Sequence, residues 1–379
     1  MKWRKDTNLY IAVLITGLLI FAFLTLFVSS ASKKEDTNIS AKAATLYEPE
    51  TGRFLYEKNA DLRLPMASTT KIMTALVALE SCELDETVEI APEAIGIEGS
   101  SAYLKQGEVL TLEELLYALL LQSANDAAVA IAYHVSGDVD GFSDLMNERA
   151  EALGLSDTHF KNPHGLDDNE HYTSAHDLAI ITAEALKNDT FKEITSTYKK
   201  RFVNGDRERN YVNHNKLLNR YSDCIGIKTG FTKKSGRCLV GAAEKNGLTF
   251  ITVTLNDPND WADHTRLFDL GFETLERVVL AEQYEYCYEI PVLGSSTENI
   301  KAKNTDELYF ITEKKNCTVI PHIKLRKFVT APIKCGDVMG EVVFTVDGEA
   351  VGSVKLISTE AADTKEKNGF WNRILSKAE

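Results

Sequence analysis

Basic residues are scarce in this sequence of 379 residues. It contains 42 lysines and arginines against 56 aspartates and glutamates, so the formal net charge is −14 and the isoelectric point lies near 5.2. Binding a phosphate backbone requires a concentrated excess of lysine and arginine. The charge balance therefore argues against a general nucleic-acid-binding protein. The length and the 44% hydrophobic content predict two globular domains plus a terminal segment.

Paired cysteines are also lacking. The six cysteines contain no C-x-x-C pair and lie at Cys82, Cys224, Cys238, Cys287, Cys317 and Cys335. This spacing predicts neither a zinc knuckle nor a thioredoxin-type site, and no other motif calls for a metal or a cofactor. Disulfides are allowed by the composition. Cys224 and Cys238 flank an expected hairpin in a register that does not place them opposite each other, so we expect no bond between them.

One apolar run at the N-terminus is long. No charged side chain occurs from Leu9 to Val28, after three basic residues within the first five positions. Ser29 and Ala31 then stand where the −3 and −1 positions of a signal-peptidase site would be. This order is typical of an export signal. The run also matches the ~20 residues that span a bilayer, so an uncleaved anchor is the alternative.

Hydrophobic patterning divides the rest of the chain. Strand-like alternation surrounds residues 50–52, helical spacing dominates from about residue 68 to 188, strands return from 224, and a helix is expected over 260–278. This order predicts an α+β fold in which an antiparallel sheet is flanked by helices. Short alternating runs beyond residue 280 predict a small all-β domain. The expected units are a signal or anchor, a linker, a main domain, a β-rich domain and a tail, over residues 1–31, 32–42, 43–280, 281–360 and 361–379.

Side chains suited to helix capping precede several of the expected helices. A Ser/Thr cluster leads into a helix that is expected to begin near Ser68, Thr111 and Glu114 form a capping-box pattern, and Ser174 precedes another helix.

Near the C-terminus, the stretch 364–379 places aromatic and aliphatic residues on one helical face with lysines and an arginine around them. That pattern fits a helix lying on a membrane surface, and a tail that docks on the β-rich domain is the alternative.

Three short motifs carry residues with catalytic chemistry. The first is Ser68-Thr69-Thr70-Lys71, which puts a serine and a lysine three residues apart on one helical face. A serine hydroxyl becomes a good nucleophile when a base takes its proton, and a lysine can be that base where burial or a nearby cation favours its neutral form. Taken alone, the motif is more simply read as a capping serine and a solvated lysine.

The second and third motifs are S-A-N and K-T-G. Ser123-Ala124-Asn125 interrupts two apolar helices, where Ser123 could relay a proton and the Asn125 amide could donate and accept hydrogen bonds. Lys228-Thr229-Gly230 lies on an expected strand, along which an extended peptide could align with its carboxylate near the lysine and threonine. A helix–helix turn and a protected strand edge are the simpler readings of each motif by itself.

In combination, the three motifs resemble those of penicillin-binding proteins and class A β-lactamases, except that the middle motif is S-A-N. The segments MASTTKIMTALVALE, SANDAAVAIA, NPHGLDDNEHYTSAHDLA and GIKTGFTKKSGRCLVGAAEKNG resemble the D-alanyl-D-alanine carboxypeptidases of low molecular mass, over about residues 43–278. This resemblance implies a penicillin-binding/β-lactamase-like transpeptidase fold with a small all-β domain behind it. It also implies an exported enzyme at the outer face of the bacterial cytoplasmic membrane or in the cell wall.

The resemblance further implies a penicillin-sensitive serine carboxypeptidase that removes the terminal D-alanine from peptidoglycan pentapeptides without a cofactor. Ser68 would attack the carbonyl between the two D-alanines, Lys71 would accept its proton, and Ser123 would help protonate the leaving D-alanine. The backbone N–H groups of Ser68 and Phe231 would hold the oxyanion, with Asn125 contacting the substrate. β-Lactams would acylate the same serine.

One segment departs from the family pattern. His214 stands where relatives often carry another basic residue. Its expected role in substrate binding depends on its position shortly before the K-T-G strand. The substrate would lie along that strand, beside Lys228, Thr229 and Gly230.

Three other functions are weighed against this one. A class A β-lactamase would need a deacylating carboxylate, for which Glu170 is available. A zinc carboxypeptidase would use His164, His171 and His176, although no H-E-x-x-H pattern is present. A wall-binding module or penicillin sensor without turnover would have no need of a nucleophile, a base and a carboxylate-binding group together.

Overall fold

The computed structural model describes residues 38–205 and 207–365. The predicted signal or anchor over 1–31, most of the predicted linker and the amphipathic stretch beyond residue 365 lie outside these residues. Within the described part of the chain, no helix is both long and apolar enough to cross a membrane.

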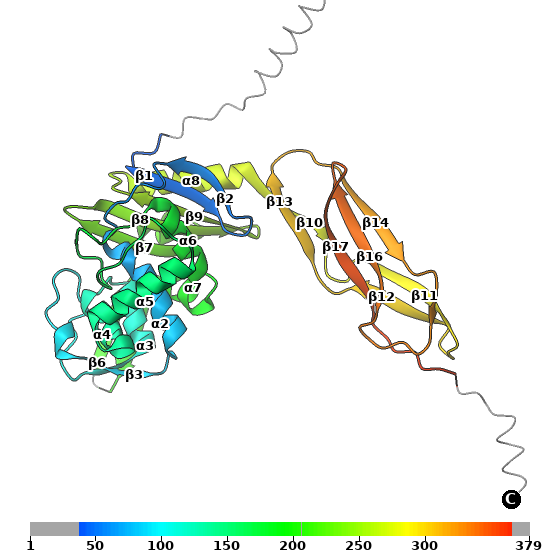
Figure 1. Ribbon diagram of the computed structural model, residues 1–379, viewed down its shortest axis with the longest axis horizontal. Coiled ribbons are helices and arrows are strands. Elements are labelled where there is room, and N and C mark those ends of the chain that lie inside the picture. The colour runs from blue at the N-terminus through cyan, green and yellow to red at the C-terminus, as the bar shows by residue number, and fades with distance from the viewer. Residues whose placement is uncertain (1–37, 206, 366–379) are drawn as a thin grey trace, which may run out of the picture. The chain divides into compact units, whose positions relative to one another are not determined.

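A five-stranded antiparallel sheet with the order β2-β1-β9-β8-β7 forms the centre of the first domain (Figure 1). Its strands are β1 (Ala43–Glu48), β2 (Arg53–Lys58), β7 (Cys224–Thr232), β8 (Gly236–Lys245) and β9 (Leu248–Leu255). β1 and β2 are the predicted hairpin, in which Ala44 pairs with Lys58. Nearly every residue of β9 is buried, because both faces of the sheet are covered. Its sequence accordingly carries apolar and β-branched side chains on both faces, with the buried hydroxyls of Thr252 and Thr254 hydrogen-bonded to His264.

Helices cover both faces of this sheet. α6 (Ala175–Ala185) contacts β1 and β9, α7 (Asp189–Ser196) contacts β7, and α8 (Asp260–Thr274) packs on β8 and β9. Figure 1 shows α6 and α8 on opposite sides of the sheet. The predicted cap of α6 is confirmed, since the side chain of Ser174 accepts a hydrogen bond from the backbone of Asp177.

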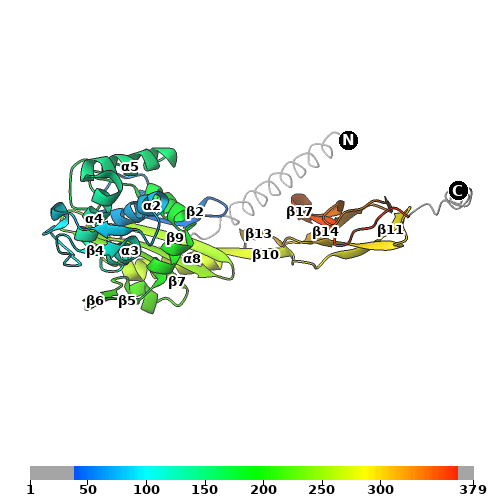
Figure 2. The ribbon, with the colours of Figure 1, turned by 90° about the horizontal axis from the view of Figure 1, so that it is seen from below.

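A group of helices lies beside α6. It consists of α2 (Lys71–Ser81), α3 (Leu112–Leu120), α4 (Asn125–Ser136) and α5 (Val139–Ala152). The group contacts α6 through α2 (Figure 1), and Figure 2 shows α5 at its outer side. Thr111 caps α3 as predicted, because its side chain accepts from the backbone N–H of Glu114. Two two-stranded antiparallel sheets border the group, β3 (Thr87–Glu89) with β4 (Val109–Thr111) and β5 (Lys199–Asn204) with β6 (Arg207–Val212).

One predicted helix end and one predicted helix cap are wrong. The helix expected over 260–278 ends at Thr274, and strand β10 (Leu275–Ala281) begins at the next residue. The β-branched residues of this segment pair with β13 (Leu308–Glu313), and Val278 lies opposite Phe310. Helical structure begins near Ser68 as expected, in a 3-10 turn, η1 (Ala67–Thr70), that leads directly into α2. The expected cap is the second error, because no side chain of the Ser/Thr cluster caps α2.

The second domain is all-β, as predicted. Its main sheet has six strands in the order β14-β16-β17-β12-β11-β15, and β10 pairs separately with β13. The strands are β11 (Cys287–Leu293), β12 (Asn299–Asn304), β14 (Val319–Leu325), β15 (Val329–Thr330), β16 (Val338–Val346) and β17 (Glu349–Ser358). A hydrophobic core distinct from that of the first domain lies inside it, around Ile290, Phe344 and Leu356.

The cysteines form no disulfide in the described part of the chain, where all six are free. The predicted register of Cys224 and Cys238 is confirmed, because the two residues are not opposite each other. In the β7–β8 ladder, Cys224 lies opposite Ala243 and Cys238 lies opposite Gly230.

Candidate active site

The turn that carries Ser68 is held in place from inside the domain. Thr70 donates its hydroxyl proton to the carbonyl of Ala67 at 2.8 Å, and His171 Nε2 lies 2.7 Å from the same hydroxyl. His171 Nδ1 accepts from the backbone N–H of Lys161, so the ring proton is on Nε2 and is donated to Thr70. Burial lowers the pKa of His171 to about 4, which keeps the ring neutral in this arrangement at pH 7.

Lys71 is fully buried at the start of α2, and its ammonium nitrogen faces three oxygen atoms. Lys71 Nζ lies 3.0 Å from Ser68 Oγ, 2.7 Å from Asn125 Oδ1 and 2.5 Å from the carbonyl oxygen of His164. Burial lowers the pKa of Lys71 well below its usual value, and the positive charge of Lys228 lowers it further. Asp126 acts in the opposite direction. The result is an amine that loses its proton easily, in hydrogen-bonding range of a serine hydroxyl.

Asn125 and Ser123 are positioned by the junction between α3 and α4. The Asn125 amide accepts from Lys71 and donates through Nδ2 to the carbonyl of Glu98. Ser123 has a φ of +61°, a left-handed conformation that turns the chain between the two helices. Asp126, which the motif analysis did not single out, anchors the neighbouring loop because its carboxylate accepts from the backbone N–H groups of Ala102 and Leu104.

The K-T-G motif lies on β7, directly beside the Ser68 turn. A side chain at Gly230 would place its Cβ 3.0 Å from the Met66 carbonyl and 3.1 Å from Ser68 N, so any larger residue would push against the Ser68 turn. Lys228 is fully buried, its Nζ donates to the Thr229 carbonyl at 2.9 Å, and burial lowers its pKa to about 7. Phe231, in contrast, is 67% exposed.

A loop that includes His164 closes the other side of Lys71. The Asn162 side chain accepts from the backbone of Gly165 at 2.7 Å, and Gly165 has a φ of +92°. A Cβ at this position would lie 2.0 Å from the Ala67 carbonyl, so the loop touches the Ser68 turn through a glycine. His164 is held neutral, since burial and the Lys71 charge lower its pKa to about 3.

The described residues do not form the arrangements that a zinc carboxypeptidase or a class A β-lactamase would require. Among the described residues, the three histidines of a zinc peptidase do not form a group with metal-ligand spacing. The His164 carbonyl accepts from Lys71, and the His171 ring binds Thr70 in the Ser68 turn. The His176 ring stacks on Phe54. Glu170 is exposed and does not line the cavity at Ser68.

A cavity of about 510 Å³ opens at Ser68. The predicted residues that line it are Ser68, Ser123, His214, Thr229, Gly230 and Phe231. Burial and the Lys228 charge lower the pKa of His214, so this ring is neutral near pH 7. Lys71, Lys228 and Asn125 are buried directly behind this lining.

Sequence reasoning missed a second part of the cavity lining. Arg237 makes a two-point ion pair with Asp260, with Nε 2.9 Å from Oδ2 and Nη2 2.6 Å from Oδ1. Its guanidinium lies 5.6 Å from the centre of the Trp261 ring, and all three residues line the cavity. Arg237 follows the turn between β7 and β8, and Asp260 and Trp261 begin α8. No sequence motif includes these three residues.

The comparisons with known proteins agree with this arrangement. Residues 29–259 match the D-alanyl-D-alanine carboxypeptidase family, and residues 276–364 match the C-terminal domain of penicillin-binding protein 5. The D-alanyl-D-alanine carboxypeptidase DacF of Bacillus subtilis is 33% identical over 94% of this chain and 95% of its own. DacC of Escherichia coli is 30% identical over 93% of this chain and 92% of its own.

Solved structures give the same result. Penicillin-binding protein 5 of Haemophilus influenzae superimposes with a TM-score of 0.62 at 28% identity, over 86% of this chain and 98% of that one. The Streptomyces K15 DD-transpeptidase superimposes with a TM-score of 0.59 at 34% identity, over 62% of this chain and 98% of its own. The predicted family, fold class and activity are therefore confirmed: the chain belongs to the D-alanyl-D-alanine carboxypeptidase family of serine peptidases and is related to the penicillin-binding proteins.

Proposed function

We propose that Ser68 is the nucleophile and Lys71 the general base of a carboxypeptidase that removes the terminal D-alanine of peptidoglycan pentapeptides. The observation that supports this most is the 3.0 Å separation between Ser68 Oγ and the buried Lys71 Nζ. Ser68 Oγ attacks the carbonyl carbon between the two D-alanines while its proton passes to Lys71. Collapse of the tetrahedral intermediate breaks the C–N bond, and the leaving amine takes a proton through Ser123. Water then hydrolyses the acyl-enzyme.

The remaining motif residues bind the substrate in this proposal. The backbone N–H groups of Ser68 and Phe231 stabilise the oxyanion, by roughly 3 kcal/mol for each donor. Asn125 holds Lys71 and the substrate amide, and the substrate lies along β7 beside Gly230. Penicillins enter the same cavity and acylate Ser68.

The terminal carboxylate of the substrate is recognised by hydrogen-bond donors of the cavity lining and by positive charge behind it. Thr229 and the neutral His214 ring donate to this carboxylate, and the buried Lys228 supplies positive potential behind them. Arg237 supplies a further cation. Asp260 and Trp261 fix its guanidinium, which remains 43% exposed at the cavity. A fixed guanidinium loses little conformational entropy when it pairs with a second carboxylate.

The domain organisation and location follow from the same proposal. Residues 43–280 carry the peptidase and residues 281–360 form a β-rich domain. Residues 1–31 export the chain or anchor it, and residues 361–379 hold it to the membrane surface. The enzyme then acts at the outer face of the cytoplasmic membrane or in the wall.

Release of D-alanine tests this function directly. An amine-blocked tripeptide ending in D-Ala-D-Ala is expected to lose one D-alanine with the wild-type chain and none with Ser68→Ala. The same peptide ending in D-Ala-L-Ala serves as the stereochemical control. Release that persists in Ser68→Ala would assign the reaction to another group. Acylation by penicillin without release would indicate a sensor.

A further inference from the structure

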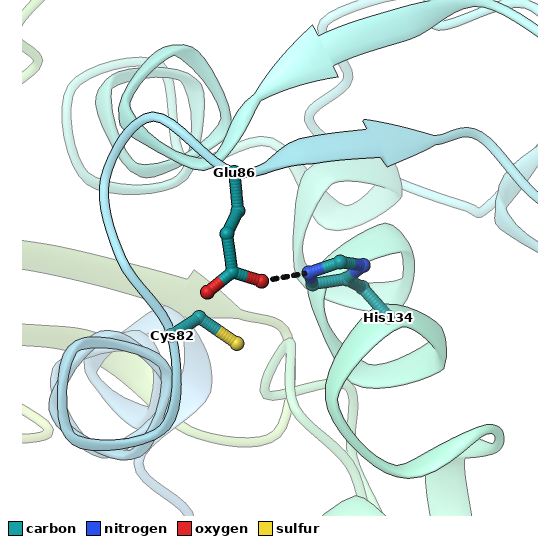
Figure 3. A group of neighbouring side chains, drawn as sticks. All are labelled: Cys82, Glu86 and His134. Carbon is teal, nitrogen blue, oxygen red and sulfur yellow. Dashed lines mark hydrogen bonds and ion pairs between the residues drawn. The ribbon is translucent and has the colours of Figure 1, made fainter.

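A second group of side chains with metal-ligand chemistry lies at the distal ends of two active-site helices. Lys71 and Asn125 are the first residues of α2 and α4. Cys82 directly follows α2 at its other end, and His134 lies in the last turn of α4. Glu86, in the turn before β3, completes the group (Figure 3).

The three ligand atoms converge. The Cys82 sulfur, a Glu86 carboxylate oxygen and a His134 ring nitrogen all lie within 4.8 Å of one another, and Glu86 Oε2 is 3.2 Å from His134 Nε2. Ligands on a tetrahedral zinc ion are separated by about 3.3–3.6 Å, given bonds of about 2.0–2.3 Å. Small side-chain rotations therefore suffice. We propose that Cys82, Glu86 and His134 bind one zinc-like divalent cation and leave a fourth position for water.

The backbone of this group is already fixed. The Glu86 carbonyl accepts from the backbone of Leu112 at 2.9 Å, and the N–H of Cys82 donates to Ala78 at 3.1 Å. The second oxygen of the Glu86 carboxylate accepts from the backbone N–H of Glu83 at 2.7 Å, which orients the first toward His134. Such second contacts are what orient metal ligands in known sites. All three side chains are partly accessible, so an ion can reach them.

The chemistry of the donors selects the class of ion. A thiolate, an imidazole and a carboxylate suit zinc and its neighbours in the first transition series, whereas calcium and magnesium prefer oxygen donors alone. Binding releases the Cys82 thiol proton to solvent as the sulfur–metal bond forms. One thiolate and one carboxylate then balance the two charges of the cation. No sequence motif marks the site, because His134 is 48 residues from Glu86.

The position indicates a structural role. The cation joins the ends of α2 and α4 opposite to those that carry Lys71 and Asn125, and none of its three ligands lines the cavity at Ser68. We therefore expect bound metal to raise the thermal stability of the first domain and to leave the rate of penicillin acylation unchanged.

Cobalt and zinc ions test the proposal on the purified full-length chain, after treatment with a chelator and a thiol reductant. Added Co²⁺ is expected to give a thiolate-to-cobalt absorption band that saturates at one equivalent and disappears when Zn²⁺ is added. Zn²⁺ is also expected to raise the melting temperature and to protect Cys82 from alkylation. Cys82→Ser and His134→Gln should lose the band and the thermal shift, whereas the matched controls Cys287→Ser and His322→Gln, at exposed positions, should keep both.

A simple Glu86–His134 ion pair beside an unrelated thiol accounts for the same 3.2 Å contact and predicts the opposite outcome. No cobalt band in the wild-type chain, or a band that survives in Cys82→Ser, overturns the metal site. Each variant is first shown to acylate with penicillin at the wild-type rate, so that loss of metal binding cannot be mistaken for misfolding. Failure of the metal site leaves the peptidase proposal intact, since the two readouts are independent.

Discussion

Lys71 and Lys228 are two fully buried lysines, and at the residue scale burial, with a smaller contribution from the Lys228 charge, accounts for how Lys71 can act as a base. Burial lowers both pKa values and holds that of Lys228 at about 7, so its charge acts on Lys71 mainly at or below neutral pH. Asn125 and the His164 carbonyl orient the Lys71 amine toward Ser68.

The pH dependence of acylation reports the pKa of Lys71. The rate is expected to fall on the acid side, because protonated Lys71 cannot accept the serine proton. Lys228→Met removes a nearby positive charge, which raises the Lys71 pKa and moves this acid limb to higher pH. A fluorescent penicillin measures the limb, and Lys245→Met, on the far part of β8, is the control. An unmoved limb, or one displaced to lower pH, contradicts the proposed coupling.

Arg237 is expected to act on substrate affinity rather than on chemistry. Arg237→Gln removes the cation but keeps a side chain that can hydrogen-bond to Asp260. KM for a peptide ending in D-Ala-D-Ala should rise about tenfold, which corresponds to ~1.4 kcal/mol, with little change in kcat. The matching peptide with a C-terminal amide should show no such rise. Equal losses on both peptides would indicate a structural role for Arg237 instead.

At the scale of elements, the site depends on two close approaches to the Ser68 turn. β7 reaches it through Gly230, and the loop around His164 reaches it through Gly165. Lys71 is thereby enclosed between α2, α4 and this loop, which excludes water and lowers its pKa. The turn itself is 3-10 rather than α-helical, so Ser68 is not part of the regular helix that positions Lys71.

Gly165→Ala tests whether this loop positions the nucleophile. The added Cβ would lie 2.0 Å from the Ala67 carbonyl, so the turn must move. Gly107 also has a positive φ, +71°, but its Cβ would meet open space. Gly107→Ala is therefore expected to cost only about 1–2 kcal/mol of stability and to keep the wild-type acylation rate. Gly165→Ala should destabilise more and slow acylation strongly. Equal behaviour of the two variants would show that the contact with Ala67 is unimportant.

At the scale of the whole molecule, two hydrophobic cores are separate. Buried side chains of the five-stranded sheet and its helices form the core of the peptidase domain, and residues from Leu280 onward form the second core. The solved Streptomyces K15 DD-transpeptidase matches over 98% of its length while covering 62% of this chain, so that structure has no counterpart of the remaining part.

A chain truncated after Leu275 is accordingly expected to fold and to react with penicillin at the wild-type rate. Leu275 is retained because it is fully buried. Circular dichroism and a thermal melt check the fold, and the second-order acylation rate checks the site. A truncated chain that melts cooperatively but reacts much more slowly would show that the β-rich domain supports the active site.

Contacts between residues close in the sequence were predictable, and contacts between distant segments of the chain were not. The S-x-x-K spacing placed Ser68 and Lys71 on one face, and their polar atoms do lie 3.0 Å apart, but the motif indicated catalysis only together with S-A-N and K-T-G. The local cap at Thr111 was found from spacing alone. The contact between Lys71 and the His164 carbonyl joins residues 93 apart, and the Arg237–Asp260 pair joins β8 to α8. Such contacts depend on the assembled fold and leave no local pattern. The end of α8 was missed because strand pairing with β13 overrides the helical spacing.

The central claim is that Ser68 is the nucleophile, and the mass of the intact protein after reaction with penicillin tests it most directly. The wild-type chain is expected to gain the mass of one penicillin, peptide mapping should place the adduct on Ser68, and Ser68→Ala should gain nothing while keeping the wild-type melting temperature. Lys71→Ala should acylate far more slowly. An adduct of normal yield on Ser68→Ala, or no adduct on the folded wild-type chain, would contradict the account.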